Sequence, residues 1–308
     1  MLGNKKRLIS SLIAFACCLV MVMFPQEAIS SARRGVFLWT TDVLPALLPF
    51  FICANYLQEA GILKYLRPGA FTLTMSILSG YPMGAKIIGD MRRKKEITLE
   101  KAMWLMSFCN TSGPAFMMGS VGAGMLGSVK AGFILAFSHY VGAVLNAIVY
   151  RKLLNCQNSF RETPKMSDLK IDEETATIQE TLTNAILASL KSVAIVLSYI
   201  VLAMFATDML EMSGLLSFID SGEARAVIKG MVEMTVGCES LAACEGVSIE
   251  VKSVLCSMMI SWGGLSVVGQ IMSMVAGTDI SLLYTLICKF THGLFSAGVA
   301  FVITAFMV

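Results

Sequence analysis

The chain has 308 residues, of which 56% are hydrophobic and only 15% are charged, with a formal net charge of +3 and a mean hydropathy of +0.72. A soluble domain carries roughly 25% charged residues, and it rarely repeats apolar runs long enough to cross the roughly 30 Å of bilayer hydrocarbon. The composition therefore excludes an ordinary soluble protein and predicts an all-α polytopic membrane protein. The expected surroundings are the lipid bilayer, and no nucleic-acid partner is expected.

Apolar runs recur from one end of the chain to the other, and about seven are long enough to be transmembrane helices. The predicted spans cover residues 8–24, 37–60, 98–120, 130–150, 183–209, 251–276 and 281–307. Two further segments, 70–90 and 224–244, are interrupted near the middle, at Ser79–Pro82 and at Thr235–Gly237. Because a broken helix survives in lipid only where it is buried in protein or lines a cavity, both segments favour re-entrant helical hairpins.

The first apolar run follows the basic cluster Lys5-Lys6-Arg7, an arrangement that also occurs in signal peptides. The run is longer than the core of a usual signal sequence, and no clean cleavage motif follows it. An uncleaved first span is therefore the favoured interpretation, with cleavage near Ser30 as the alternative. The positive-inside rule places the cluster, and with it the N-terminus, in the cytoplasm.

The order span, hairpin, span, span occurs twice along the chain, which predicts an internal repeat. Glycines recur at nearly constant offsets, because Gly84 matches Gly237 and Gly113 matches Gly263. The predicted organisation is an N-terminal transmembrane helix and linker (1–36), repeat 1 (37–150), a polar cytoplasmic loop (151–181) and repeat 2 (182–308).

Each repeat has three full spans, an odd number, so the second repeat must insert upside down relative to the first. The turns after the two hairpins differ in charge as this requires: Arg92–Lys95 is basic, whereas the second turn carries Glu239, Glu245 and Glu250. The positive-inside rule places the basic turn in the cytoplasm and the acidic turn outside. Arg33-Arg34 falls on the outer side and is the exception. The sequence therefore predicts two inverted-topology repeats.

Polar residues at membrane depth gather at four interruptions, two in the hairpins and two in the spans that follow them. Broken helices expose N–H groups that suit a carboxylate and carbonyl groups that suit a cation, and paired broken segments are typical of transporter binding sites. The candidate substrate-binding residues are Ser79, Gly80, Tyr81, Lys86, Asn110, Thr111, Ser112 and Gly113. The candidate coupling or second-repeat residues are Glu233, Thr235, Gly237, Ser261, Gly263 and Gly264.

Several candidates have an alternative interpretation. Lys86 either binds an anion or extends to the cytoplasmic face. Glu233 is either a site of cation or proton coupling, as intramembrane ionisable residues usually are functional, or it forms a structural pair with Lys86 or Lys229. Asn110–Pro114 is either a true helix break, with proline at a new helix start, or a plain proline kink.

His139 and His292 lie on the last spans of the two repeats, where a helix–helix hydrogen bond is favoured over a proton relay. The nine cysteines form no C-x-x-C pair and lie mostly in apolar segments, so they are interpreted as small buried residues. Phosphate-binding, zinc-protease and serine-nucleophile motifs are missing from the sequence. We therefore expect neither an enzyme nor a metal site nor a cofactor, and the coupling ion, H⁺ or Na⁺, stays open.

Three motifs carry a resemblance to a known family: LPALLPFF (Leu44–Phe51), SGYPMGAK (Ser79–Lys86) and SFCNTSGPAF (Ser107–Phe116). With them the sequence resembles the YlbJ-type sporulation integral membrane proteins, of the nucleoside-recognition (Gate) domain group related to concentrative nucleoside transporters. The resemblance is clear over residues 40–150 and weaker over 180–300. It implies a transporter-like fold and, for the sporulation branch, export of dipicolinic acid from the mother cell across the outer forespore membrane.

The favoured functional hypothesis is a secondary transporter of a small anionic metabolite, dipicolinic acid by resemblance. Asn110, Thr111 and Ser112 suit its carboxylates, and Tyr81 offers a ring face or a hydroxyl group. A nucleoside–cation symporter on the same fold is one alternative, and a non-transporting membrane scaffold or gate regulator is another. Assembly into a homo-oligomer also stays open.

Overall fold

Residues 2–61, 67–154 and 177–306 are described by the computed structural model, and all regular secondary structure within them is helical. The helices are α1 (Leu2–Met23), α2 (Pro25–Leu38), the π-helix η1 (Trp39–Val43), α3 (Leu44–Glu59), α4 (Pro68–Ser79), α5 (Met83–Arg93), α6 (Leu99–Met106), the π-helix η3 (Ala115–Met125), α7 (Val129–Leu153), α8 (Ile178–Met212), α9 (Gly222–Val232), α10 (Met234–Ala242), α11 (Ile249–Trp262), α12 (Gly264–Met274) and α13 (Leu282–Ala305). The prediction of an all-α protein is confirmed.

In this described part, four helical segments are long and apolar enough to cross a membrane: α7, α8, α13 and the segment Ile249–Met274 that comprises α11 and α12. A fifth is reached if Ala14–Met23 and Pro25–Thr41, between which the chain bends by 107°, count as one span. The predicted number of about seven is larger because segments 37–60 and 98–120 are divided into shorter helices. The chain is a multi-pass membrane protein.

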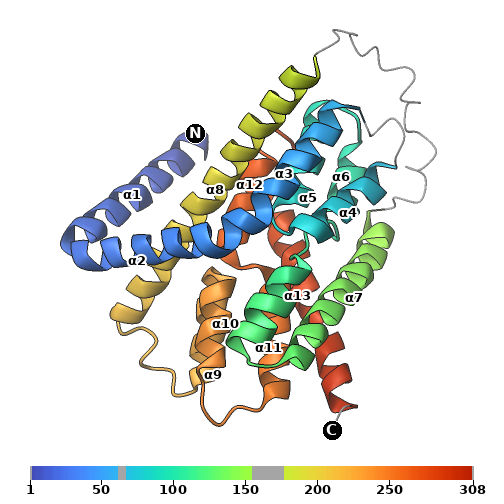
Figure 1. Cartoon of the computed structure of the whole chain (residues 1–308). Helices are drawn as coiled ribbons and strands as arrows, with labels where there is room; N and C mark the ends of the chain where they lie inside the picture. Colours follow the sequence, from blue (N-terminus) through green and yellow to red (C-terminus); the bar gives the residue numbers. More distant parts are fainter. Residues whose placement is uncertain (1, 62–66, 155–176, 307–308) are drawn as a thin grey trace.

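The residues predicted as a linker after the first span form helix α2, which packs against α8 (Figure 1). Pro25 occupies its first turn, where proline is preorganised for a helix. Ser31 and Arg34 of α2 both contact the carboxylate of Asp208 on α8. An acidic partner therefore neutralises one of the two arginines that break the positive-inside pattern. Most of the predicted cytoplasmic loop 151–181 lies outside the described residues.

Helix starts differ in how their first N–H groups are satisfied. In one group a Ser or Thr side chain accepts a hydrogen bond from a backbone N–H group of the first turn, and this cap stabilises a helix by about 1 kcal/mol. The members of this group are α6 (Thr98), α7 (Ser128), α8 (Thr177), α9 (Ser221), α11 (Ser248) and α13 (Ser281). The helices that resume after an interruption, α5, η3 and α12, have no side-chain cap, and α10 is capped by Glu233.

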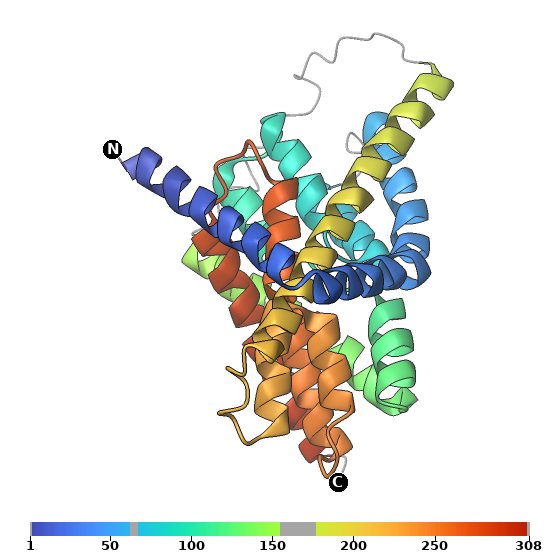
Figure 2. The ribbon, with the colours of Figure 1, turned by 90° about the vertical axis from the view of Figure 1, so that its left-hand side faces the viewer.

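The two halves of the chain pack against each other along several pairs of helices. Helices α3 and α8 are in contact, and so are α7 and α13. The second helix of each hairpin packs against the helix that follows a break in the other half of the chain. Thus α5 contacts α12, and α10 contacts η3. Helices α4, α5 and α6 lie toward one end of the molecule, and α9 and α10 lie toward the other (Figures 1 and 2).

The basic turn after α5 is anchored to the turn between α12 and α13. Arg92 donates two hydrogen bonds to the Asp279 carboxylate, at 2.9 and 2.7 Å, and Arg93 donates to the carbonyl groups of Met274 and Ala276. Hydrogen bonding from the Arg92 guanidinium lowers the pKa of Asp279 below its usual value of 3.8. This anchor joins the first half of the chain to the second outside the membrane-spanning segments.

Replacing Asp279 with asparagine is expected to lower the unfolding temperature slightly at neutral pH, because the pair is partly exposed. A carboxyl group whose pKa is lower in the folded state stabilises the fold above its unfolded pKa and loses this contribution as pH falls through the folded pKa. The difference in unfolding temperature between wild type and Asp279→Asn should therefore disappear as the pH drops below 3.8. Asp220→Asn in an exposed loop is the control; a wild-type advantage that persists in acid contradicts the prediction.

Candidate functional site

A cavity of about 530 Å³ lies between the two halves of the chain. Its walls include residues from three of the four interruptions, together with α12, the helix that follows the fourth. Helices α3 and α8 contribute apolar side chains such as Leu47, Phe50, Val196 and Ile200. Because most of the lining is apolar, the few polar groups determine what the cavity can bind.

The interruptions of the first half touch each other at this cavity. Hairpin α4–α5 breaks at Gly80, whose backbone has φ +80°, and a Cβ atom added there would lie 2.9 Å from the Gly113 nitrogen. Gly113 belongs to the break between α6 and η3, so the predicted break at Asn110–Pro114 is present and is more than a proline kink. Ser79, Tyr81 and Ser112 flank these glycines and also line the cavity.

The second hairpin breaks at Glu233, not at Thr235–Gly237 as the sequence predicts. Glu233 is extended (φ −142°, ψ 117°), ends α9 and caps α10, because its carboxylate accepts the Val236 N–H at 2.8 Å. This side-chain cap replaces the glycine-based interruption that the sequence favours. The break also contacts the one between α11 and α12, since a Cβ atom on Gly264 (φ +80°) would lie 2.7 Å from the Val232 oxygen.

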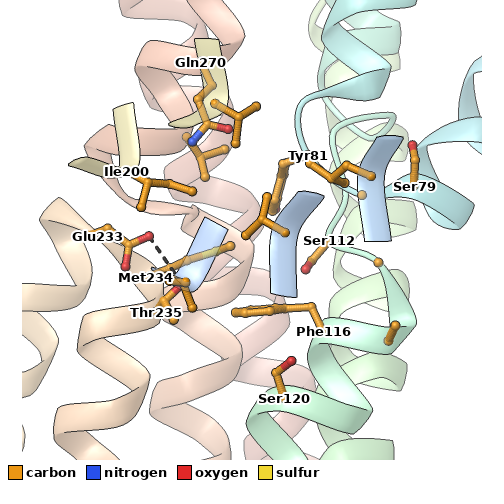
Figure 3. Close-up of a pocket in the computed structure, with 18 of the residues that line it drawn as sticks. Ser79, Tyr81, Ser112, Phe116, Ser120, Ile200, Glu233, Met234, Thr235 and Gln270 are labelled. Atoms are coloured by element: carbon orange, nitrogen blue, oxygen red, sulfur yellow. Dashed lines mark hydrogen bonds between the residues drawn. The ribbon is translucent and has the colours of Figure 1, made fainter. Parts of the chain in front are cut away.

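The polar groups of the cavity face one another across it (Figure 3). Glu233 and Thr235 lie on one side, and Ser79 and Ser112 lie on the other. Gln270 of α12 adds an amide group whose nitrogen donates to Ser266 at 3.3 Å. Of the described residues that line the cavity, Glu233 is the one with an acidic or basic side chain.

Glu233 pairs with neither lysine that its structural interpretation requires. Lys229 binds Glu211 at 2.8 Å, and Lys86 binds Asp90 at 2.9 Å. The carboxylate instead contacts the first turn of α10, with the Thr235 hydroxyl 3.4 Å away. Glu233 therefore places a carboxylate in the cavity without a cationic partner in the described part of the chain.

The structure places several of the predicted site residues beside the cavity rather than on its surface. Lys86 lies on α5, forms an ion pair with Asp90 and is absent from the cavity lining. Thr111 binds Ser76 at 3.0 Å and is fully buried. The others that are absent from the lining are Asn110, Gly237, Ser261, Gly263 and Gly264.

His139 of α7 joins the breaks of the two halves. Its Nε2 accepts the Ser112 N–H at 2.9 Å, and its Nδ1 lies 2.7 Å from the Ser261 hydroxyl. Because Nε2 must be an acceptor, the ring proton lies on Nδ1 and the imidazole is neutral. His292 of α13 contacts the His139 carbonyl at 2.9 Å, which is the helix–helix hydrogen bond that the sequence favours.

Lys289 of α13 lies beside the site, and the sequence analysis did not identify it. Its side chain is buried, and its Nζ donates to the Tyr81 hydroxyl at 2.6 Å and to the Asn110 carbonyl at 3.2 Å. The available signal was a single lysine in the predicted span 281–307, which holds no other Lys, Arg, Asp or Glu. Lysine at such a depth is rare and usually functional.

Comparison with known proteins identifies one relative that matches nearly the whole chain. The sporulation integral membrane protein YlbJ of Bacillus subtilis (strain 168) is 26% identical over 330 aligned residues, which cover 94% of this chain and 80% of the relative. No protein-family model matches the chain, and no solved structure matches it significantly. The comparison confirms the resemblance to the YlbJ-type sporulation integral membrane proteins that the motifs of the first half indicate.

Proposed function

We propose that the protein is a secondary transporter of a small anionic metabolite. The observation that carries this proposal is the cavity between the two halves, which is lined by helix interruptions from both of them. Interrupted segments at corresponding positions of two halves are typical of binding sites in secondary transporters, because their free backbone groups and helix ends can bind charged ligands in the membrane.

The two halves are, in this proposal, inverted-topology repeats with two re-entrant hairpins. The reciprocal contacts α5–α12 and α10–η3 support it, since a two-fold axis between two copies would generate such a pair. The positions of hairpins α4–α5 and α9–α10 toward opposite ends also support it (Figure 1). The basic turn after α5 would then face the cytoplasm, on the same side as the N-terminus.

The proposed substrate is dipicolinic acid, exported across the outer forespore membrane during sporulation. The cavity volume suits a single-ring molecule. Phe116 and Tyr81 offer aromatic faces for a pyridine ring, and Ser112 offers a hydroxyl donor for a carboxylate, whereas the Ser79 hydroxyl donates to the Met75 carbonyl. The sporulation context comes from the name of the relative YlbJ, and the substrate comes from the family resemblance. Glu233 would be the coupling carboxylate, which binds H⁺ or Na⁺ as the anion moves.

Flux measurements on purified protein in proteoliposomes test the proposal. We expect dipicolinate to cross vesicles that contain the protein faster than empty vesicles, and we expect uridine to cross both equally slowly. Sodium-dependent uridine uptake would overturn the proposal in favour of a nucleoside–cation symporter. Flux of neither compound would overturn it in favour of a scaffold or gate regulator.

A further inference from the structure

Lys289 lies within α13 with only 2% of its surface exposed. None of the ion pairs in residues 2–61, 67–154 and 177–306 includes it. A lysine at this depth costs several kcal/mol to hold in its charged form unless a counter-charge or strong dipoles compensate it. The fold therefore retains a cationic residue that packing alone does not require.

The contacts of Lys289 place its Nζ atom next to Tyr81, which lines the cavity on the first-half side. Its Nζ lies 2.6 Å from the Tyr81 hydroxyl and 4.3 Å from the centre of the Tyr81 ring. Tyr81 in turn donates to the Ile260 carbonyl at 3.1 Å and lines the cavity with its side chain. A single aromatic side chain thus separates the ammonium group from the cavity.

Asn110, which lies beside Lys289, has a side-chain oxygen without a hydrogen-bond partner among the described residues. Asn110 is 2% exposed, and its Oδ1 has no hydrogen-bond partner, whereas its backbone carbonyl accepts from Lys289 at 3.2 Å. Buried amide oxygens are nearly always paired, so an orphaned one indicates a site that a ligand, an ion or a water completes. The cation and the free acceptor lie at the same break, between α6 and η3.

The charges of the cavity are consequently separated. Glu233 places its carboxyl group on the second-half side, and Lys289 places its amino group behind Tyr81 on the first-half side. A small carboxylate-bearing molecule is repelled by the former and attracted by the latter. Such an arrangement orients the anion toward the first half and leaves the region of Glu233 for the coupling cation.

We propose that Lys289 is the residue that makes the cavity selective for an anion: held behind Tyr81, its protonated amino group compensates a substrate carboxylate bound on the cavity side of the Tyr81 ring. This inference rests on the proposed transport of an anionic metabolite. Lys289 acts through Tyr81 and is therefore a positioning residue for the substrate. Its removal should weaken substrate binding without weakening the fold, because methionine replaces the aliphatic stem of lysine without burying a charge.

The test is the KM of dipicolinate flux in proteoliposomes made with wild type, Lys289→Met, Lys289→Arg and Tyr81→Phe. We expect Lys289→Met to raise the KM at least about tenfold, Lys289→Arg to restore part of the loss because it keeps the charge, and Tyr81→Phe to raise the KM because the hydroxyl link is lost. Lys191→Met, at an exposed position of α8, is the matched control and should behave as wild type.

A wild-type KM in Lys289→Met, or a lower maximal rate at unchanged KM, overturns the role of Lys289 and leaves the proposed function intact. If wild-type protein carries no dipicolinate, the proposed function fails and this inference fails with it. Size-exclusion profiles and unfolding temperatures establish that each variant is folded. Should Lys289→Met not fold, Tyr81→Phe decides the question, and an unchanged KM in that variant overturns the proposal.

Discussion

Replacing Gly84 with alanine is expected to disrupt the hairpin α4–α5 and abolish transport. A Cβ atom at this position would lie 1.6 Å from the carbonyl oxygen of Cys109 and 2.6 Å from its carbonyl carbon. Overpacking a core costs about 1–3 kcal/mol when side chains can adjust. Because the obstructing atoms here are backbone atoms beside the break after α6, we expect a larger loss, measured as a lower unfolding temperature and a lower yield of monodisperse protein.

Gly119→Ala is the matched control for this prediction. Gly119 lies in η3, on the other side of the same break, and a Cβ atom there would meet no other atom within 4 Å. This variant should keep the unfolding temperature and the flux of wild type. Equal stability of Gly84→Ala and Gly119→Ala would contradict the close contact between α5 and the Cys109 backbone.

The interruptions that depend on backbone chemistry can be predicted from the sequence. Gly80 and Pro82 weaken a helix through conformational freedom and a missing N–H donor, and the structure breaks at this position. Gly263 and Gly264 adopt positive φ values of 86° and 80°, which glycine tolerates better than any other residue. The all-helical character of the chain is likewise predictable, because it needs only the lengths and spacing of apolar runs.

The interruption in the second hairpin could not be located in this way. Gly237, which marks the break in the sequence interpretation, lies inside α10 and permits close packing, since a Cβ atom there would lie 2.3 Å from the Gly230 Cα atom. The break itself depends on the extended backbone and the capping carboxylate of Glu233. A break made by a side-chain cap has no glycine or proline signature.

The cavity and its charge distribution depend on tertiary contacts that link distant parts of the chain. Lys289 and Tyr81 are separated by 208 positions in the sequence, and no local pattern pairs them. The apolar walls likewise come from α3 and α8, whose lining residues are indistinguishable from lipid-facing ones in the sequence. Sequence analysis can therefore identify the broken segments but not which of their side chains face a common space.

Replacing Glu233 with alanine is expected to lower dipicolinate flux at least about tenfold, because it removes an ionisable group that is costly to retain at this depth. The substitution also removes the cap of α10, which costs about 1 kcal/mol. Glu233→Gln separates the two effects, since an amide oxygen can still accept the Val236 N–H while the negative charge is lost. We expect this variant to unfold at nearly the wild-type temperature but to carry dipicolinate without dependence on an ion gradient.

The measurement compares flux under an imposed pH gradient and, separately, under an imposed sodium gradient. Glu239→Gln is the matched control, because Glu239 lies on the same helix but is exposed, and it should keep the response of wild type. The gradient that stimulates wild type but not Glu233→Gln identifies the coupling ion. A Glu233→Gln protein that responds to both gradients as wild type does would contradict a coupling role, and Glu233 would then act only as the cap that shapes this side of the cavity.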